Sequence, residues 1–141
     1  MRAVFPGSFD PTTQGHLDVA RRAAAVVGEL VVCVLTNPAK PGRLALPERL
    51  ALLSDLIGDL PNVTVDAAPG RLLVDYCREE GMDVIVRGVR TPADLEHELP
   101  MALANRRLTG VETLFVPTSP ERAYVSSTLV AATAARRSVR G

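Results

Sequence analysis

Short apolar runs alternate with longer helical patterns along almost the whole chain, and this alternation limits the possible folds more than any other feature. Runs typical of strands occupy Ala3–Phe5, Leu30–Leu35, Val63–Asp66, Val84–Val86 and Thr113–Val116. Helical patterns occupy Gly15–Val27, Pro47–Ile57, Arg71–Glu80, Pro92–Leu108 and Ser126–Arg137. Strands that alternate with helices predict a parallel sheet with right-handed crossovers. We therefore expect an α/β protein with one Rossmann-like, doubly wound domain, a five-stranded parallel sheet and helices on both faces.

The length and the charge of the chain limit the architecture and the partners. A chain of 141 residues suits a single domain that spans residues 1–141, with a tail at roughly 136–141 that frays. The formal net charge is zero, which argues against nucleic acid as a partner. Apolar runs are too short to cross a bilayer, so no membrane partner is expected. Cys33 and Cys77 lie in apolar or helical segments, and reduced, buried thiols and the lack of a signal-peptide pattern favour a cytoplasmic protein.

Polar stretches follow four of the five predicted strands. They read "PGSFDPTTQGH", "TNPAKPGR", "RGVRT" and "PTSPERAYVSST". In an open parallel sheet, ligands bind outside the carboxyl ends of the strands, where the strand order reverses. Because these stretches carry most of the hydroxyls, the only Lys and several Arg, the sequence predicts a site for an anionic ligand at this edge.

Several residues in these stretches suit phosphate oxygens, although each also has a purely structural interpretation. His16 begins a helix, where free N–H groups and the helix dipole favour an anion, but it is equally a first-turn surface residue. Arg87 and Arg90 offer bidentate forks or form an exposed pair. Ser126–Thr128 contains three hydroxyls, one of which suffices as a helix cap. Lys40 either binds an anion or is simply solvated.

Other patterns narrow the chemistry and the shape of the site. The chain has no G-x-x-x-x-G-K loop, no G-x-G-x-x-G fingerprint and no C-x-x-C pair, so neither common phosphate loop nor a metal cluster is expected. Pro100 falls inside a predicted helix, where it predicts a kink or break near His97–Pro100. Glu96 and Glu98 are expected on a solvated face of that helix.

Together, "PGSFDPTTQGH", "VRGVR" and "VSST" resemble the nucleotidyltransferase superfamily with its T/H-x-G-H motif, most closely the phosphopantetheine adenylyltransferase family. The resemblance runs from Arg2 to about Ala135, and the ordered patterns PGSFDP-x-x-x-GH, RG-x-R-x-x-x-DLEHE and SST make it specific. It implies transfer of the adenylyl group of ATP to 4′-phosphopantetheine, giving dephospho-coenzyme A and pyrophosphate in coenzyme A biosynthesis. The phosphate oxygen of the acceptor would attack directly in line, without a covalent intermediate.

The resemblance also assigns roles to residues. His16 would be the catalytic residue. Residues implied in ATP binding are Ser8, Phe9, His16, Gly88, Val89, Arg90, Glu98, Arg122, Ala123, Tyr124, Val125, Ser126, Ser127 and Thr128. Residues implied in binding 4′-phosphopantetheine are Ser8, Lys40, Leu73 and Arg87. Mg²⁺ would arrive with ATP and need no protein ligand, and the family implies a homohexamer with coenzyme A as a feedback ligand.

Two departures from the family pattern keep other functions open. His97 stands where the family usually has Tyr, and Pro100 where a polar residue is common, both in the helix expected to line the pantetheine pocket. One alternative is therefore a sister nucleotidyltransferase with another phosphate acceptor, such as nicotinamide mononucleotide or glycerol phosphate. Lys40 together with Arg87 argues against it. The other is a non-catalytic nucleotide-binding homologue, which would be expected to have lost His16 or Arg90.

Overall fold

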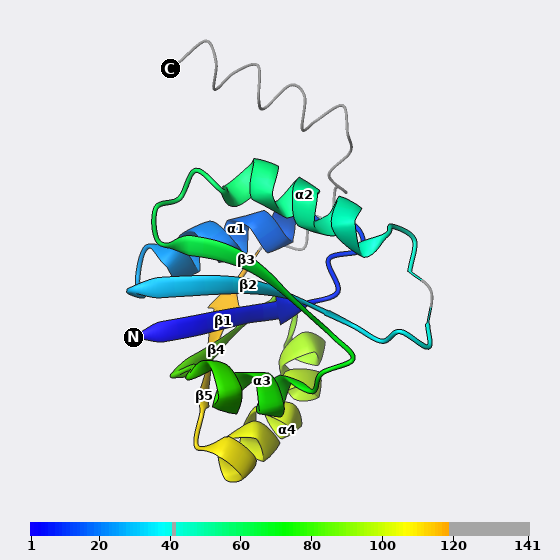
Figure 1. Ribbon diagram of the computed structural model, residues 1–141. Helices are drawn as coiled ribbons and strands as arrows, with labels where there is room; N and C mark the ends of the chain where they lie inside the picture. Colours follow the sequence, from blue (N-terminus) through cyan, green and yellow to red (C-terminus); the bar gives the residue numbers. More distant parts are fainter. Residues whose placement is uncertain (41, 119–141) are drawn as a thin grey trace.

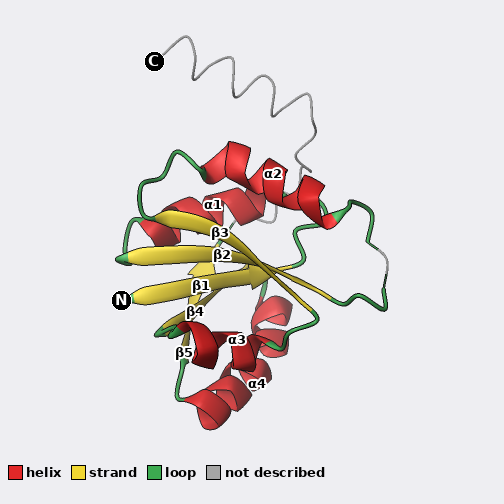
Figure 2. Ribbon diagram, in the orientation of Figure 1, coloured by secondary structure: helices red, strands yellow, loops and turns green. Residues whose placement is uncertain are grey.

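The computed structural model describes residues 1–40 and 42–118, and shows a five-stranded parallel sheet flanked by helices (Figures 1 and 2). The elements are β1 (Arg2–Gly7), α1 (Gln14–Ala24), β2 (Glu29–Thr36), α2 (Leu46–Ile57), β3 (Val63–Pro69), α3 (Leu73–Glu80), β4 (Val84–Val89), α4 (Pro92–Thr109) and β5 (Glu112–Pro117). The predicted α/β class and the predicted five parallel strands are confirmed. The last predicted helix, Ser126–Arg137, lies outside the described residues.

The strand order is β3-β2-β1-β4-β5, so the chain builds the sheet outward from its centre in both directions. β1 pairs in parallel with β2 on one side, and Ala3 faces Val84 of β4 on the other. Helices α1 and α2 cover one face, while α3 and α4 cover the opposite face (Figure 1). The winding therefore reverses between β1 and β4, and the carboxyl ends of these two strands flank the crevice in which such sheets bind ligands.

Two apolar cores fill the spaces between the sheet and its helices. Alternate residues of each strand point to opposite faces, so Ala3 and Phe5 enter the core beneath α1 and α2, whereas Val4 enters the core beneath α3. Cys33 and Cys77 belong to the second core, where both are buried and free, as the sequence predicted. The central strands are buried on both faces, which explains their continuous apolar runs.

Local signals account for most helix boundaries. Thr13 caps α1, Thr91 caps α4, and Pro residues occupy the first turns of α2 and α4. α1 ends at Ala24, three residues before the predicted end, and α3 begins two residues after its predicted start. No helix among the described residues is long and apolar enough to span a membrane.

The break predicted near Pro100 is wrong, because α4 continues through this residue to Thr109. Pro100 is exposed, so its ring meets no packed neighbour beyond its own helix. The helix before Pro100 is anchored by the Thr91 cap and by the buried Glu98, two positions before the proline. These anchors outweigh the single backbone hydrogen bond that a proline removes.

Candidate active site

A cavity of about 460 Å³ opens at the carboxyl ends of β1 and β4, at the reversal of the strand order. The first connection, between β1 and α1, contributes Ser8 and Asp10, and the first turn of α1 contributes His16. The β4–α4 segment contributes Arg87 and Arg90, and other lining residues include Gly7, Pro11, Thr13, Gly15, Gly88, Asp94, His97, Glu98 and Thr118. The predicted clustering of polar loops at this edge is confirmed for the segments that follow β1, β4 and, at Thr118, β5.

His16 is held at the start of α1 by a reciprocal cap. The Thr13 N–H donates to Nδ1 of His16 at 3.0 Å, and the His16 N–H donates to the Thr13 hydroxyl at 3.2 Å. Burial, together with the positive charges of Arg90 and Arg87, lowers the pKa of His16 from 6.5 to about 4. The imidazole is therefore neutral at pH 7, and since Nδ1 accepts a hydrogen bond, its proton lies on Nε2. His16 thus presents one N–H donor at the cavity.

Two aromatic rings, those of Phe5 and Phe9, pack against the imidazole of His16. The ring of Phe9 is 1% exposed and packs edge-on against His16 and Phe5, with ring centroids 5.0 and 5.4 Å away. The sequence predicted that Phe9 contacts ATP. The structure places its side chain in the core beneath the imidazole, so the ring's role in this chain is to support His16.

Arg87, at the end of β4, is fixed by two elements. Its Nε and Nη2 donate to the two carboxylate oxygens of Glu98 at 3.0 and 2.8 Å, and its Nη1 donates to the Pro6 carbonyl at 3.2 Å. A guanidinium has five N–H groups, so two on the Nη atoms are not used by these bonds. The sequence pattern placed Glu98 on a solvated helix face, which is wrong. Glu98 is the buried residue of α4 because Arg87 lies opposite it.

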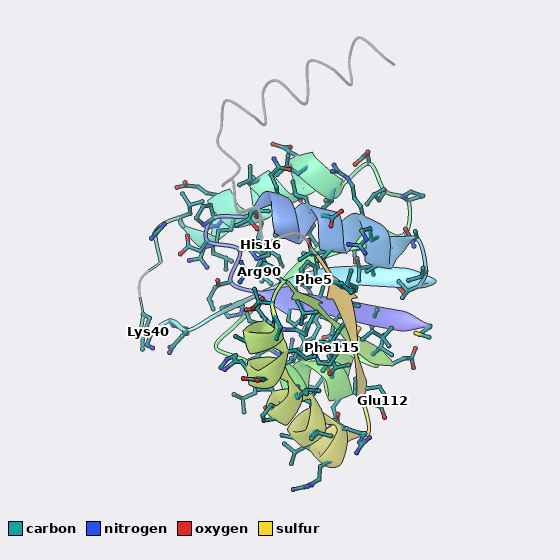
Figure 3. The ribbon with its side chains drawn as sticks, turned by 180° about the vertical axis from the view of Figure 1, so that it is seen from behind. Phe5, His16, Lys40, Arg90, Glu112 and Phe115 are labelled. Carbon is teal, nitrogen blue, oxygen red and sulfur yellow. The ribbon has the colours of Figure 1, made fainter. Side chains whose placement is uncertain are left out.

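Arg90 is oriented by the first turn of α4. Its Nε donates to Asp94 at 3.1 Å and its backbone N–H to the same oxygen at 3.0 Å. These hydrogen bonds from Arg90 lower the pKa of Asp94, so the carboxylate stays ionised beside the guanidinium. Figure 3 shows Arg90 and His16 near each other, and both side chains line the cavity.

Gly88 allows α1 to approach β4 closely. A Cβ at this position would lie 2.8 Å from Cγ2 of Val19, closer than carbon atoms pack. Val19 belongs to α1, the helix that begins with His16, so a side chain at Gly88 would displace this helix. Val89 follows Gly88, and its carbonyl accepts a hydrogen bond from the Thr118 N–H.

A second, smaller cavity of about 110 Å³ adjoins the first through Arg87 and Glu98, which line both. Its remaining lining consists of Leu73, Ile85, Met101, Ala102, Asn105 and Thr113. The hydroxyl of Thr113 is buried without a hydrogen-bond partner among the described residues. Leu73, predicted to bind the acceptor, therefore lies in a mostly apolar recess beside the polar cavity.

The structure does not bring every predicted residue to the cavity. Ser8 lines it, but Lys40 is exposed on the second connection, between β2 and α2, and does not line either cavity. Figure 3 shows Lys40 well away from His16 and Arg90. The predicted ATP-binding segment 122–128 lies outside the described residues.

Sequence reasoning missed residues that act on the site through other residues. Asp10 and the buried Arg49 form an ion pair with 3.6 Å between Nη2 and Oδ2, beside the cavity. Thr13 and Asp94 orient His16 and Arg90. The capping pattern around Thr13 and Thr91 was a usable local signal for two of these residues. No local pattern links Asp10 to Arg49, since 39 positions separate them.

Among residues 1–40 and 42–118, no group of three or more His, Cys, Asp or Glu side chains is arranged to hold a metal ion. The cavity instead presents cationic and neutral donors, namely Arg87, Arg90 and the N–H of His16. Such donors suit phosphate oxygens.

This fold and this arrangement of donors define a Rossmann-like α/β protein with donors for an anionic ligand at its switch point, and comparisons agree with the fold. A family model described as cytidylyltransferase-like matches residues 4–133. A solved structure, the bifunctional NMN adenylyltransferase/ADP ribose pyrophosphatase from Francisella tularensis, shares the fold with a TM-score of 0.63 at 13% identity, over 91% of this chain and 40% of that chain.

Curated relatives narrow the assignment. A protein named phosphopantetheine adenylyltransferase from Nocardioides sp. is 54% identical over 92% of this chain and 80% of its own length. A protein of the same name from Corynebacterium diphtheriae is 53% identical over 91% of this chain and 80% of its own. The chain belongs to the cytidylyltransferase-like nucleotidyltransferases and, within them, to the phosphopantetheine adenylyltransferase family.

Proposed function

We propose that the protein transfers the adenylyl group of ATP to 4′-phosphopantetheine and releases dephospho-coenzyme A and pyrophosphate. The names of the curated relatives support this pair of substrates. The observation that carries the chemistry is the placement of His16, Arg87 and Arg90 around one cavity at the reversal of the strand order.

The reaction needs neither a general base nor a covalent nucleophile. A phosphate oxygen of the acceptor is already anionic, and it attacks the α-phosphorus of ATP in line. The new P–O bond forms as the bridging bond to the β-phosphate breaks, and pyrophosphate leaves with the electron pair. Catalysis then consists of positioning the reactants and neutralising charge on the phosphates.

His16 is the proposed catalytic residue. Its Nε2–H donates to an oxygen of the α-phosphate as negative charge develops there. A neutral donor makes this hydrogen bond without losing its proton, and the lowered pKa of His16 keeps the imidazole neutral in the ligand-free site. Arg90, fixed by Asp94, and the β4–α4 segment that carries Gly88 and Val89 would hold the nucleotide.

The acceptor would lie on the side of Arg87 that faces the smaller cavity. The two unused N–H groups of this guanidinium would bind the acceptor phosphate, while Glu98 fixes its plane. The recess that begins at Leu73 would receive the pantetheine arm, whose chain is less polar than its phosphate. Lys40 would join the phosphate from the β2–α2 connection.

Other parts of the function are proposed from the family alone. Mg²⁺ would enter with ATP and neutralise phosphate charge. Ser127 and Thr128 would contact those phosphates, within a segment, Arg122–Thr128, that also surrounds the adenine. We further expect a cytoplasmic homohexamer with coenzyme A as a feedback ligand. The surface of α4 offers apolar contacts for assembly, because Leu99, Met101, Leu103 and Leu108 are 41–59% exposed.

Pyrophosphate release tests the function directly. The protein is incubated with ATP and magnesium and with 4′-phosphopantetheine, nicotinamide mononucleotide or glycerol phosphate as the acceptor. Release with phosphopantetheine alone is the expected result. Release with another acceptor would reassign the substrate, and ATP binding without release for any acceptor would identify a non-catalytic nucleotide-binding protein.

A further inference from the structure

The carboxylate of Asp10 joins two connections that are distant in the sequence. Asp10 belongs to the first connection, between β1 and α1. Its Oδ2 accepts the Arg43 N–H at 2.7 Å and its Oδ1 accepts the Leu44 N–H at 2.8 Å. Both N–H groups belong to the second connection, between β2 and α2. One carboxylate of the first connection thus holds two successive peptide groups of the second.

Arg49 completes this join from the start of α2. Its side chain is 8% exposed, and it donates from Nε to the Leu44 carbonyl at 3.0 Å and from Nη1 to the Ser8 carbonyl at 3.3 Å. Its Nη2 lies 3.6 Å from Oδ2 of Asp10. A buried guanidinium is retained where it satisfies several partners, and here the partners come from both connections.

Gly42 leaves the space that this ion pair occupies. A Cβ built at Gly42 would overlap Nη2 of Arg49 and Oδ2 of Asp10. Any other residue at this position would therefore push the pair apart or displace the second connection. Asp10, Arg49 and Gly42 are called the clasp below.

The two connections joined by the clasp carry different parts of the proposed site. Ser8 lies on the first connection and His16 in the first turn of the helix that follows it, and Lys40 lies two positions before Gly42 on the second connection. We propose that the clasp is a positioning device for the acceptor, which holds the connection of Lys40 in register with Ser8 and His16. This inference rests on the proposed function. In this role, Asp10 and Arg49 act through Lys40 and do not bind substrate themselves.

A double-mutant cycle between Asp10 and Lys40 tests the proposal. Asp10→Asn keeps the size of the side chain but turns an NH₂ group toward a backbone N–H, which opens the clasp. We expect it to lower kcat/KM for phosphopantetheine by about tenfold, with KM for ATP changed by less than about threefold. When Asp10→Asn is added to Lys40→Ala, kcat/KM should fall further by less than about twofold. Once the Lys40 ammonium is gone, the position of the connection that carried it no longer affects the acceptor.

Two further variants open the clasp by other routes. Arg49→Lys keeps the charge but loses the planar fork, and Gly42→Ala adds one methyl without removing any hydrogen-bonding group. Both should reproduce the loss in kcat/KM for the acceptor. Asp75→Asn and Arg107→Lys make matched changes on α3 and α4, outside both cavities, and should leave it unchanged. Thermal unfolding identifies variants that fail to fold, and if Asp10→Asn is one of them, the cycle is run with Gly42→Ala.

The outcomes separate this inference from the proposed function. If the wild-type protein is active and the losses in kcat/KM from Asp10→Asn and Lys40→Ala multiply fully, the role of the clasp is refuted but the proposed function is not. The same holds if Asp10→Asn changes KM for ATP or the magnesium dependence as strongly as KM for the acceptor, since Asp10 would then contact the nucleotide or its ion. An inactive wild-type protein would refute the proposed function and, with it, the inference that rests on it.

Discussion

On the face of the sheet covered by α1 and α2, Leu17, Leu53, Leu56 and their neighbours form a continuous apolar core. On the opposite face, polar pairs replace much of this packing. Tyr76 of α3 donates to Asp66 of β3 at 2.7 Å, Arg87 pairs with Glu98, and Leu103 of α4 is 52% exposed. Apolar burial is non-directional, whereas hydrogen bonds and ion pairs depend on angle and distance.

This difference between the two faces affects the catalytic residue and the proposed acceptor recess differently. His16 begins α1, whose inner residues belong to the larger core, so its donor is placed on the more strongly packed face. The recess proposed for the acceptor lies on the other face, where a smaller apolar core and a few polar contacts hold α3 and α4. We therefore expect changes on the first face to affect chemistry or global stability, and changes on the second to affect mainly local order and acceptor binding.

The largest effect is expected for His16→Ala. Loss of the only donor proposed for the developing α-phosphate charge should lower kcat by about 10³-fold, or about 4 kcal/mol. The core residues of α1 remain, so the far-ultraviolet spectrum and the dissociation constant for ATP should change little. His97→Ala removes the other imidazole that lines the cavity and should cost far less in kcat. An unfolded His16→Ala protein would make the role of His16 structural.

Core truncations compare the two faces directly. Leu53, on α2, is 1% exposed, and Leu53→Ala should lower the free energy of unfolding by about 3 kcal/mol. Leu103→Ala on α4 should cost less than about 0.5 kcal/mol in the monomer, because the side chain is already in solvent. Denaturant unfolding at low protein concentration measures both. Equal losses would contradict the proposed difference between the faces.

Tyr76→Phe examines the polar network of the second face. The hydroxyl of Tyr76 is buried against Asp66, and its loss leaves a carboxylate oxygen without this donor, so the free energy of unfolding should fall by about 1–2 kcal/mol. Asp66 itself is exposed, so water solvates the freed carboxylate, and Asp66→Asn in the same protein should change the free energy of unfolding little. Thermal unfolding of the two variants gives the comparison. A neutral Tyr76→Phe would show that apolar packing holds α3.

A pH dependence of stability also originates at His16. Its pKa of about 4 in the folded protein lies below the value of 6.5 expected for the unfolded chain. Between these values the unfolded chain takes up a proton that the folded protein does not, so stability is fully present above about pH 6.5 and is lost as pH falls toward 4. The melting temperature of the wild type should therefore fall by several degrees more than that of His16→Gln between pH 7 and pH 4.5. Parallel curves would show that the imidazole is not held neutral.

Several parts of the site followed from the sequence because they depend on local signals or on the geometry of parallel sheets. Thr13 and the start of α1 are a capping pattern, and the ends of β1 and β4 had to meet at one edge. His16, Arg87 and Arg90 were therefore predicted together, and the structure places all three around one cavity. Their proposed roles come from the family resemblance and await the experiments above.

Other predictions depended on contacts that no local pattern encodes. Glu98 was placed in solvent because its neighbours are polar, but Arg87, 11 positions away, draws it into the structure. A kink or break was expected near His97–Pro100, but α4 continues without a break to Thr109, with Thr91 and Glu98 holding the part of the helix before the proline. The family resemblance assigns Lys40 to the acceptor phosphate, and the structure shows it exposed and outside both cavities, so this role stays a prediction.

The sequence by itself determined the order of the elements, their parallel arrangement and the edge at which the site forms. It did so because apolar periodicity, helix caps and the handedness of crossovers act over a few residues or apply to every α/β chain. Only the tertiary structure decided that Phe9 supports the imidazole, that Glu98 orients Arg87, and that Asp10 and Arg49 join two connections. These contacts arise between residues far apart in the chain, and their energies depend on distances and burial that exist only after folding.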